Sequence, residues 1–60
     1  MEEGKKYLVI FNDGERVRDK KLVFKSFSNN FAVFFNPFTR TEESINISNI
    51  IRTEEVSKND

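Results

Sequence analysis

The side chains best suited to binding a ligand form a basic segment in the first half of the chain. It has a local excess of four positive charges, because one acid, Asp19, stands against Arg16, Arg18, Lys20, Lys21 and Lys25. Phe24 and Phe27 lie among or next to these bases. Proteins that hold single nucleic-acid strands combine basic side chains for phosphates with aromatic rings for bases. The segment therefore predicts a nucleic-acid-binding surface made of the five bases and Phe27.

The same segment has a structural interpretation. Lys and Arg are common on exposed edge strands, where their charge prevents pairing with a second sheet. The chain as a whole carries ten basic and ten acidic residues and no net charge. This balance argues against indiscriminate polyanion binding, which depends on many phosphate contacts. From the sequence, both interpretations stay open.

A cluster of aromatic residues around Pro37 is the second candidate for binding. Three of the chain's seven phenylalanines lie in the five residues Phe34-Phe35-Asn36-Pro37-Phe38. A core this small does not easily enclose all three rings, so we expect at least one to lie on the surface. Exposed rings beside Arg40 fit a protein-binding site or a contact between two copies of the chain, with Phe34, Phe38 and Arg40 as its residues. The alternative is a ring that closes one end of the fold.

Catalysis is not expected. The chain has no Cys and no His, which excludes disulfides, zinc–thiolate sites and imidazole chemistry. The acid pairs Glu42-Glu43 and Glu54-Glu55 are sequence neighbours, so the two carboxylates of each pair point to opposite faces of a strand. The acids near Gly14 lack the spacing of a calcium loop. We predict a non-enzymatic protein with no cofactor and no metal.

Short apolar runs separated by turn residues predict a β protein. Strands are expected at 7–11, 22–27, 31–35 and 50–56. Another is expected before the last of these; it begins within the polar stretch 39–43 and continues through the alternating residues Ile45 and Ile47. Turns are expected at Asp13-Gly14, at Ser28–Asn30 and at Asn36-Pro37, and a turn of 3₁₀ helix is expected near Ser48-Asn49. The charged stretch 15–21 fits either an exposed strand or a loop.

These strands predict a five-stranded antiparallel SH3-like barrel. Its expected core is Leu8, Ile10, Val17, Leu22, Phe24, Phe31, Val33, Phe35, Ile45, Ile47, Ile50 and Ile51. If the first strand uses its other face, Tyr7, Val9 and Phe11 replace Leu8 and Ile10.

The order of these signals resembles the Sm-like family, which includes the bacterial RNA chaperone Hfq. The similarity lies in an apolar strand ending at Phe11-Asn12-Asp13-Gly14, a bent strand at 17–27, a turn at Asn29 or Asn30, an apolar strand at 31–35, and the short crossing Ile47-Ser48-Asn49-Ile50-Ile51. The resemblance implies an SH3-like barrel and RNA binding. It does not imply a ring assembly.

The length of the chain predicts its domain organisation, and its hydropathy predicts where the protein is located. Sixty residues predict one domain over 1–60, ordered over about 5–56 with polar ends. No apolar run approaches the roughly 18 residues of a membrane span, and the first residues lack a signal-peptide pattern. We therefore expect a cytoplasmic protein that does not contact membranes. Its partner is expected to be nucleic acid or protein, and self-association is a further option.

Overall fold

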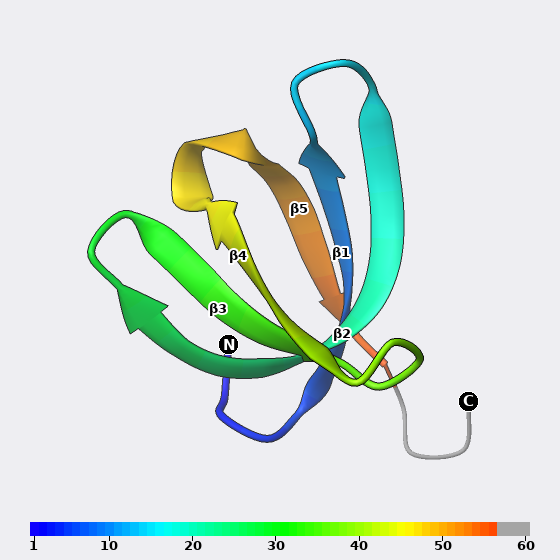
Figure 1. The fold of residues 1–60 in the computed structure, drawn as a ribbon, viewed down its shortest axis with the longest axis vertical. Helices are drawn as coiled ribbons and strands as arrows, with labels where there is room; N and C mark the ends of the chain where they lie inside the picture. Colours follow the sequence, from blue (N-terminus) through cyan, green and yellow to red (C-terminus); the bar gives the residue numbers. More distant parts are fainter. Residues whose placement is uncertain (57–60) are drawn as a thin grey trace.

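The computed structural model describes residues 1–56 and folds them into one curled antiparallel sheet (Figure 1). The strands are β1 (Lys6–Asn12), β2 (Val17–Ser28), β3 (Phe31–Asn36), β4 (Thr41–Asn46) and β5 (Ile50–Glu55), and the 3₁₀ turn η1 (Ile47–Asn49) joins the last two. They lie in the order β4-β3-β2-β1-β5. The expected all-β fold with five antiparallel strands is confirmed.

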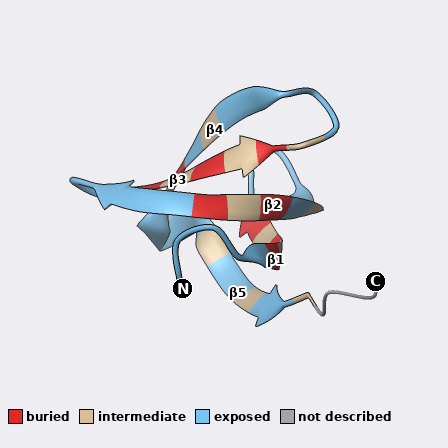
Figure 2. Ribbon diagram, turned by 90° about the horizontal axis from the view of Figure 1, so that it is seen from below, coloured by how far each residue is buried: buried red, intermediate tan, exposed pale blue. Residues whose placement is uncertain are grey.

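The sheet curls without closing into a complete barrel. β4 and β5 are its two edges, and no hydrogen-bonded ladder joins them among the described residues. β5 pairs with β1 alone and contains no buried residue. Most buried residues lie on the three central strands, as Figure 2 shows. The described residues contain no helical segment with the length and apolar character that a membrane span requires.

The charged stretch 15–21 is largely strand. β2 begins at Val17, opposite Asn12, and stays in register with β1 to the pair Lys6 and Val23. The tight turn before it needs a residue with positive φ, and Gly14 supplies it at φ 101°. Because β1 is apolar and central, it provides a pairing partner that keeps even a charged segment extended.

A β-bulge bends β2 at Lys25. The pairing with β3 shifts between Phe24 and Ser26, so Lys25 is the extra residue. Before the bulge, Phe24 is opposite Phe34; after it, Phe27 is opposite Ala32. Cross-strand partners share a face. The bulge therefore moves Phe27 onto the face of Phe24, whereas simple alternation predicts opposite faces.

Eight side chains form the core, and this set differs in part from the core expected from the sequence. They are Tyr7, Val9, Phe11, Leu22, Phe24, Ala32, Phe34 and Ile45, with Ile50 packed against them. β1 uses the alternative face, so Leu8 and Ile10 are only half-buried. Burial is confirmed for Leu22, Phe24 and Ile45, whereas Val17, Ile47 and Ile51 are exposed.

The face assigned to β3 was wrong. Phe31, Val33 and Phe35 were expected in the core, but Ala32 and Phe34 are buried instead. Pairing explains the difference, because Phe34 is opposite the buried Phe24 and must share its face. The larger number of apolar residues on the other face of β3 did not decide which face is buried.

Candidate nucleic-acid interface

Asp13 fixes the tip of the β1–β2 hairpin. Its Oδ1 accepts hydrogen bonds from the backbone N–H groups of Glu15 and Arg16, both at 2.9 Å, and its Oδ2 pairs with the Arg18 guanidinium. The backbone bond from Arg16, then that from Glu15, then the bond from Arg18 hold the pKa of Asp13 well below its usual value. The carboxylate therefore stays ionised, and the loop that carries Arg16 is held in one conformation.

The five predicted bases do not share one face. Arg18 and Lys20 have the parity of the buried Leu22, so they lie on the inner face of β2. Lys21 lies on the outer face, opposite Leu8 of β1. Lys25 occupies the bulge. The structure thus brings Arg18 and Lys20 together near Arg16, and it separates them from the other two.

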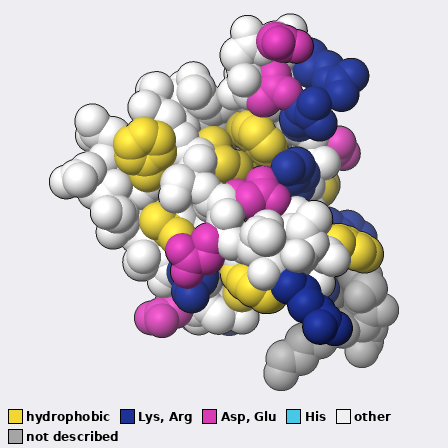
Figure 3. Space-filling view, viewed as in Figure 1, with side chains coloured by type: hydrophobic (Ala, Val, Ile, Leu, Met, Phe, Trp, Pro, Cys, Tyr) yellow, Lys and Arg dark blue, Asp and Glu magenta, His cyan; other side chains and the backbone are white. Residues whose placement is uncertain are grey.

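Three of the five bases have acidic partners. Arg18 pairs with Asp13, the Lys20 Nζ lies 2.9 Å from Glu43 Oε1, and the Lys25 Nζ lies 3.0 Å from Glu42 Oε2. Counting these three acids reduces the local excess from four positive charges to one. Figure 3 shows basic and acidic side chains next to one another along the right side of the view. Within residues 1–56, only Arg16 and Lys21 of the five have no ion pair.

Lys20 belongs to a polar cluster that the sequence pattern did not predict. Glu43 accepts a hydrogen bond from Lys20 and one of 2.6 Å from the Asn36 amide nitrogen. Burial raises the pKa of Glu43, but the bonds from Asn36 and Lys20 outweigh it, so the net pKa is lowered. Asn36 is buried, and its Oδ1 accepts from the backbone N–H of Phe38 at 2.9 Å. This one amide therefore fixes both Glu43 and the β3–β4 turn.

Three of the bases line a shallow hollow at the N-terminal end of β2. It has a volume of about 250 Å³ and is lined by Arg16, Val17, Arg18, Asp19 and Lys20. Asp19 is the only acid in this lining. Three of the five lining residues of the hollow are therefore basic.

The predicted aromatic residues have different outcomes. Phe27 is 56% exposed and lies against Phe24, with ring centroids 4.9 Å apart. Phe38 is 86% exposed in the β3–β4 turn, where Arg40 is also exposed and has a φ of 59°. Phe34 is fully buried. Its assignment to a protein interface was wrong, because the pairing with Phe24 places it in the core.

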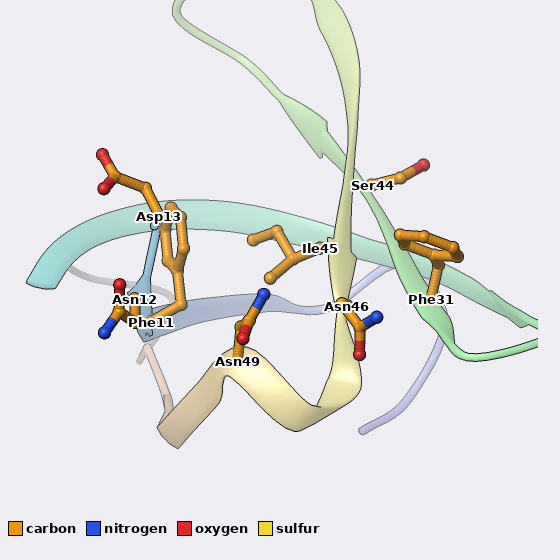
Figure 4. Close-up of a pocket in the computed structure, with 8 residues that line it drawn as sticks. All are labelled: Phe11, Asn12, Asp13, Phe31, Ser44, Ile45, Asn46 and Asn49. Carbon is orange, nitrogen blue, oxygen red and sulfur yellow. The ribbon is translucent and has the colours of Figure 1, made fainter. Parts of the chain in front are cut away.

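A second cleft, which the sequence did not predict, lies where β1 and β4 end. It has a volume of about 290 Å³ and is lined by Phe11, Asn12, Asp13, Phe31, Ser44, Ile45, Asn46 and Asn49 (Figure 4). Its residues come from four separate segments. The one local signal was Ser48-Asn49, and that signal indicated only a turn.

Comparisons with known proteins add no assignment. No protein-family model, no curated protein and no solved structure matches the chain. Within residues 1–56, no group of three or more His, Cys, Asp or Glu residues is placed to hold a metal ion. The function of the chain must therefore be inferred from its own geometry.

Proposed function

We propose that the chain is a small, non-catalytic binding module for single-stranded nucleic acid, and that the hollow at the N-terminal end of β2 holds the phosphates. The observation that carries this proposal is the grouping of Arg16, Arg18 and Lys20 around one concave surface. Arg16 has no ion pair among the described residues and is carried by a loop that Asp13 fixes. A planar guanidinium on a backbone held in one conformation is well suited to a phosphate, to which it can donate two parallel hydrogen bonds.

The ion pairs in the hollow limit the expected affinity. Arg18 and Lys20 must exchange a carboxylate for a phosphate, whereas Arg16 needs no exchange. One to three phosphate contacts predict that log Kobs falls with log salt at a slope of about −0.7 to −2.1 for a single strand. Lys21 lies away from the hollow and adds attraction without direct contact, whereas the charge of Lys25 is neutralised by Glu42. Phe27, half-exposed on the inner face, offers a ring on which a base farther along the strand can stack.

The test is fluorescence anisotropy with a labelled single-stranded oligonucleotide over a salt series. Arg16→Ala is the variant of choice, because the backbone N–H of Arg16 still bonds Asp13. Lys6→Ala is the matched control, since it removes one exposed positive charge from the opposite end of β1. The proposal expects Arg16→Ala to weaken binding and flatten the salt slope by about 0.7. Absence of binding at low salt, or an equal loss in both variants, would overturn it.

A protein-interaction module is the second candidate, and Phe38 favours it. The ring is 86% exposed, yet its backbone N–H is held by the buried Asn36. An aromatic side chain on a fixed turn, close to Arg40, has the composition of an interface anchor. Phe38→Asp should then abolish self-association or partner binding and leave the fold intact. Sedimentation of the wild type as a monomer at all concentrations would remove the self-association form of this candidate.

A further inference from the structure

The outer edge of β5 offers backbone groups to a further strand. β5 pairs with β1 on one side, and no strand of residues 1–56 pairs with its other side. Figure 2 shows β5 at the lower end of the curled sheet and β4 at the upper end. An unpaired edge presents a row of N–H and C=O groups that another strand can bond. β5 contains neither Lys nor Pro, two residues that commonly prevent such pairing.

The hydrogen-bond register identifies which groups of β5 point outward. The backbone N–H of Val56 bonds a carbonyl of β1 at 3.0 Å. Hydrogen-bonded and non-hydrogen-bonded pairs alternate along an antiparallel ladder, so Glu54 and Arg52 are the next residues that bond to β1. Thr53 and Glu55 alternate with them. The N–H and C=O groups of these two residues therefore point to the free edge.

The ladder on the other side of β1 agrees with this register. The backbone N–H of Phe24 bonds the carbonyl of Lys5 at 2.9 Å. By the same alternation, Val9 bonds to β2 and not to β5. Val9 is the residue opposite Thr53. The backbone groups of Thr53 are thus not used by β1.

The charges of β5 fit a second copy of the same strand. Arg52 and Glu54 share the outer face of the sheet, since they are opposite Ile10 and Leu8 of β1. Both side chains are exposed, and they pair with each other within the chain. A two-fold axis at Thr53 would place Arg52 of each copy opposite Glu54 of the other. Positive and negative charges would then alternate across the axis.

Other symmetric arrangements of the edges are less favourable. An axis at Arg52 or at Glu54 would put like charges directly opposite each other, which destabilises a strand pair. The other edge, β4, has only acids as charged residues, and both Glu42 and Glu43 are already paired with lysines of β2. In the arrangement centred on Thr53, each Thr53 N–H bonds the carbonyl of the other copy, and the outward direction of these groups allows that exchange.

From this register and these charges we propose that two copies of the chain pair antiparallel through β5, with Thr53 at the two-fold axis and ion pairs between Arg52 of each copy and Glu54 of the other. One sheet then runs through both copies. Two short edges bury little surface, so the dimer should be weak and reversible. The inference is independent of the proposed nucleic-acid function, because it uses no residue of the hollow.

The first experiment exchanges the charges and measures self-association by sedimentation equilibrium. Arg52→Glu and Glu54→Arg each put like charges opposite one another, so each should weaken association about tenfold or more. An equimolar mixture of the two variants should associate as the wild type does, because every carboxylate again faces a guanidinium. The double variant Arg52→Glu/Glu54→Arg, which keeps the net charge, should do the same alone. Lys21→Glu, an equal change of charge on β2, is the matched control and should leave association unchanged.

Three outcomes of this experiment would overturn the inference. One is a mixture and a double variant that both stay monomeric while their ¹⁵N–¹H spectra show intact folds. Another is a wild type that stays monomeric at the concentrations used for NMR. The third is a species larger than a dimer, because a two-fold contact between identical edges closes at two copies and only a heterologous contact continues.

A second experiment tests the backbone pairing. Thr53→Pro removes an N–H that β1 does not use, and proline is tolerated at such positions of an edge strand. The variant should fold and fail to dimerise, whereas Thr53→Val, which keeps the N–H, should dimerise. In a sample of differently labelled copies, an NOE between the Hα atoms of Arg52 and of Glu54 in the other copy should report the register, since partners of this kind have the closest backbones. Dimerisation of Thr53→Pro at wild-type strength would contradict pairing through β5.

Discussion

The rings of Phe24 and Phe27 lie on the same face of β2, with centroids 4.9 Å apart and planes inclined at 56°. Residues three positions apart on a regular strand face opposite sides. The extra residue Lys25 removes this alternation, and the result is an aromatic surface that runs from the buried core out to solvent. Phe27 is thereby held in place by the core while most of its ring stays available.

Truncation of two phenylalanines from the aromatic cluster should have very different effects. Phe34→Ala removes a fully buried ring and should lower the free energy of unfolding by about 3–5 kcal/mol. Phe38→Ala, at an exposed position, should change it by less than about 0.5 kcal/mol. Urea unfolding followed by circular dichroism measures both. A large loss for Phe38→Ala would mean that its ring packs against the fold.

Stability should fall in acid because of Glu43. Its pKa is lowered in the folded state from the ordinary value of 4.5, so the folded protein binds the proton less readily than the unfolded chain. The contribution of Glu43 is therefore fully present above about pH 4.5 and is lost as pH falls through the folded pKa. The measurement is urea unfolding between pH 3 and pH 7 for the wild type and Glu43→Gln. The difference between the two should be constant near neutral pH and shrink in acid, and a difference independent of pH would contradict the assignment.

Asp13→Asn should strengthen binding to oligonucleotides. The asparagine oxygen can still accept from the backbone of Glu15 and Arg16, but it no longer neutralises Arg18. One more free base should make the slope of log Kobs against log salt steeper by about 0.7. Anisotropy titration of the variant beside the wild type measures this change. Weaker binding with an intact fold would show that the Arg18 pair is needed for the site.

The β1–β2 and β2–β3 turns should respond differently when the conformational freedom of the backbone is changed. Gly14 has a φ of 101°, and a Cβ there would meet no atom within 4 Å, so Gly14→Ala tests backbone strain alone. We expect a loss of about 1 kcal/mol in the free energy of unfolding. Asn29 has a φ of 55°, and Asn29→Gly should be nearly neutral because glycine adopts that conformation freely. Chemical denaturation of both variants measures the contrast.

The strands and turns could be predicted from local patterns, whereas the faces of the strands could not. Asp13-Gly14 and Ser28–Asn30 marked two of the three hairpins because the conformation of a tight turn depends on the residues within it. The burial of Phe34 depended on its partner Phe24, and the exposure of Phe27 depended on the bulge, so neither could be read from alternation. Pairing across strands determined both.

The site was harder to predict than the fold for the same physical reason. Arg16, Arg18 and Lys20 were found from their types and spacing, but their acidic partners include Glu43, which is distant in sequence. The cleft likewise combines Phe11 with Asn49, which only the folded sheet brings together. Local charge therefore overstated the positive surface, and local composition gave no sign of the cleft.

The position of β5 has a consequence for motion in the native protein. This strand contributes no buried side chain and is hydrogen-bonded to β1 alone. Segments with few apolar contacts open at a lower free energy than the rest of a fold. Amide hydrogens of β5 should thus exchange with deuterium sooner than those of β2, through excursions in which the last strand detaches and the remaining four stay folded.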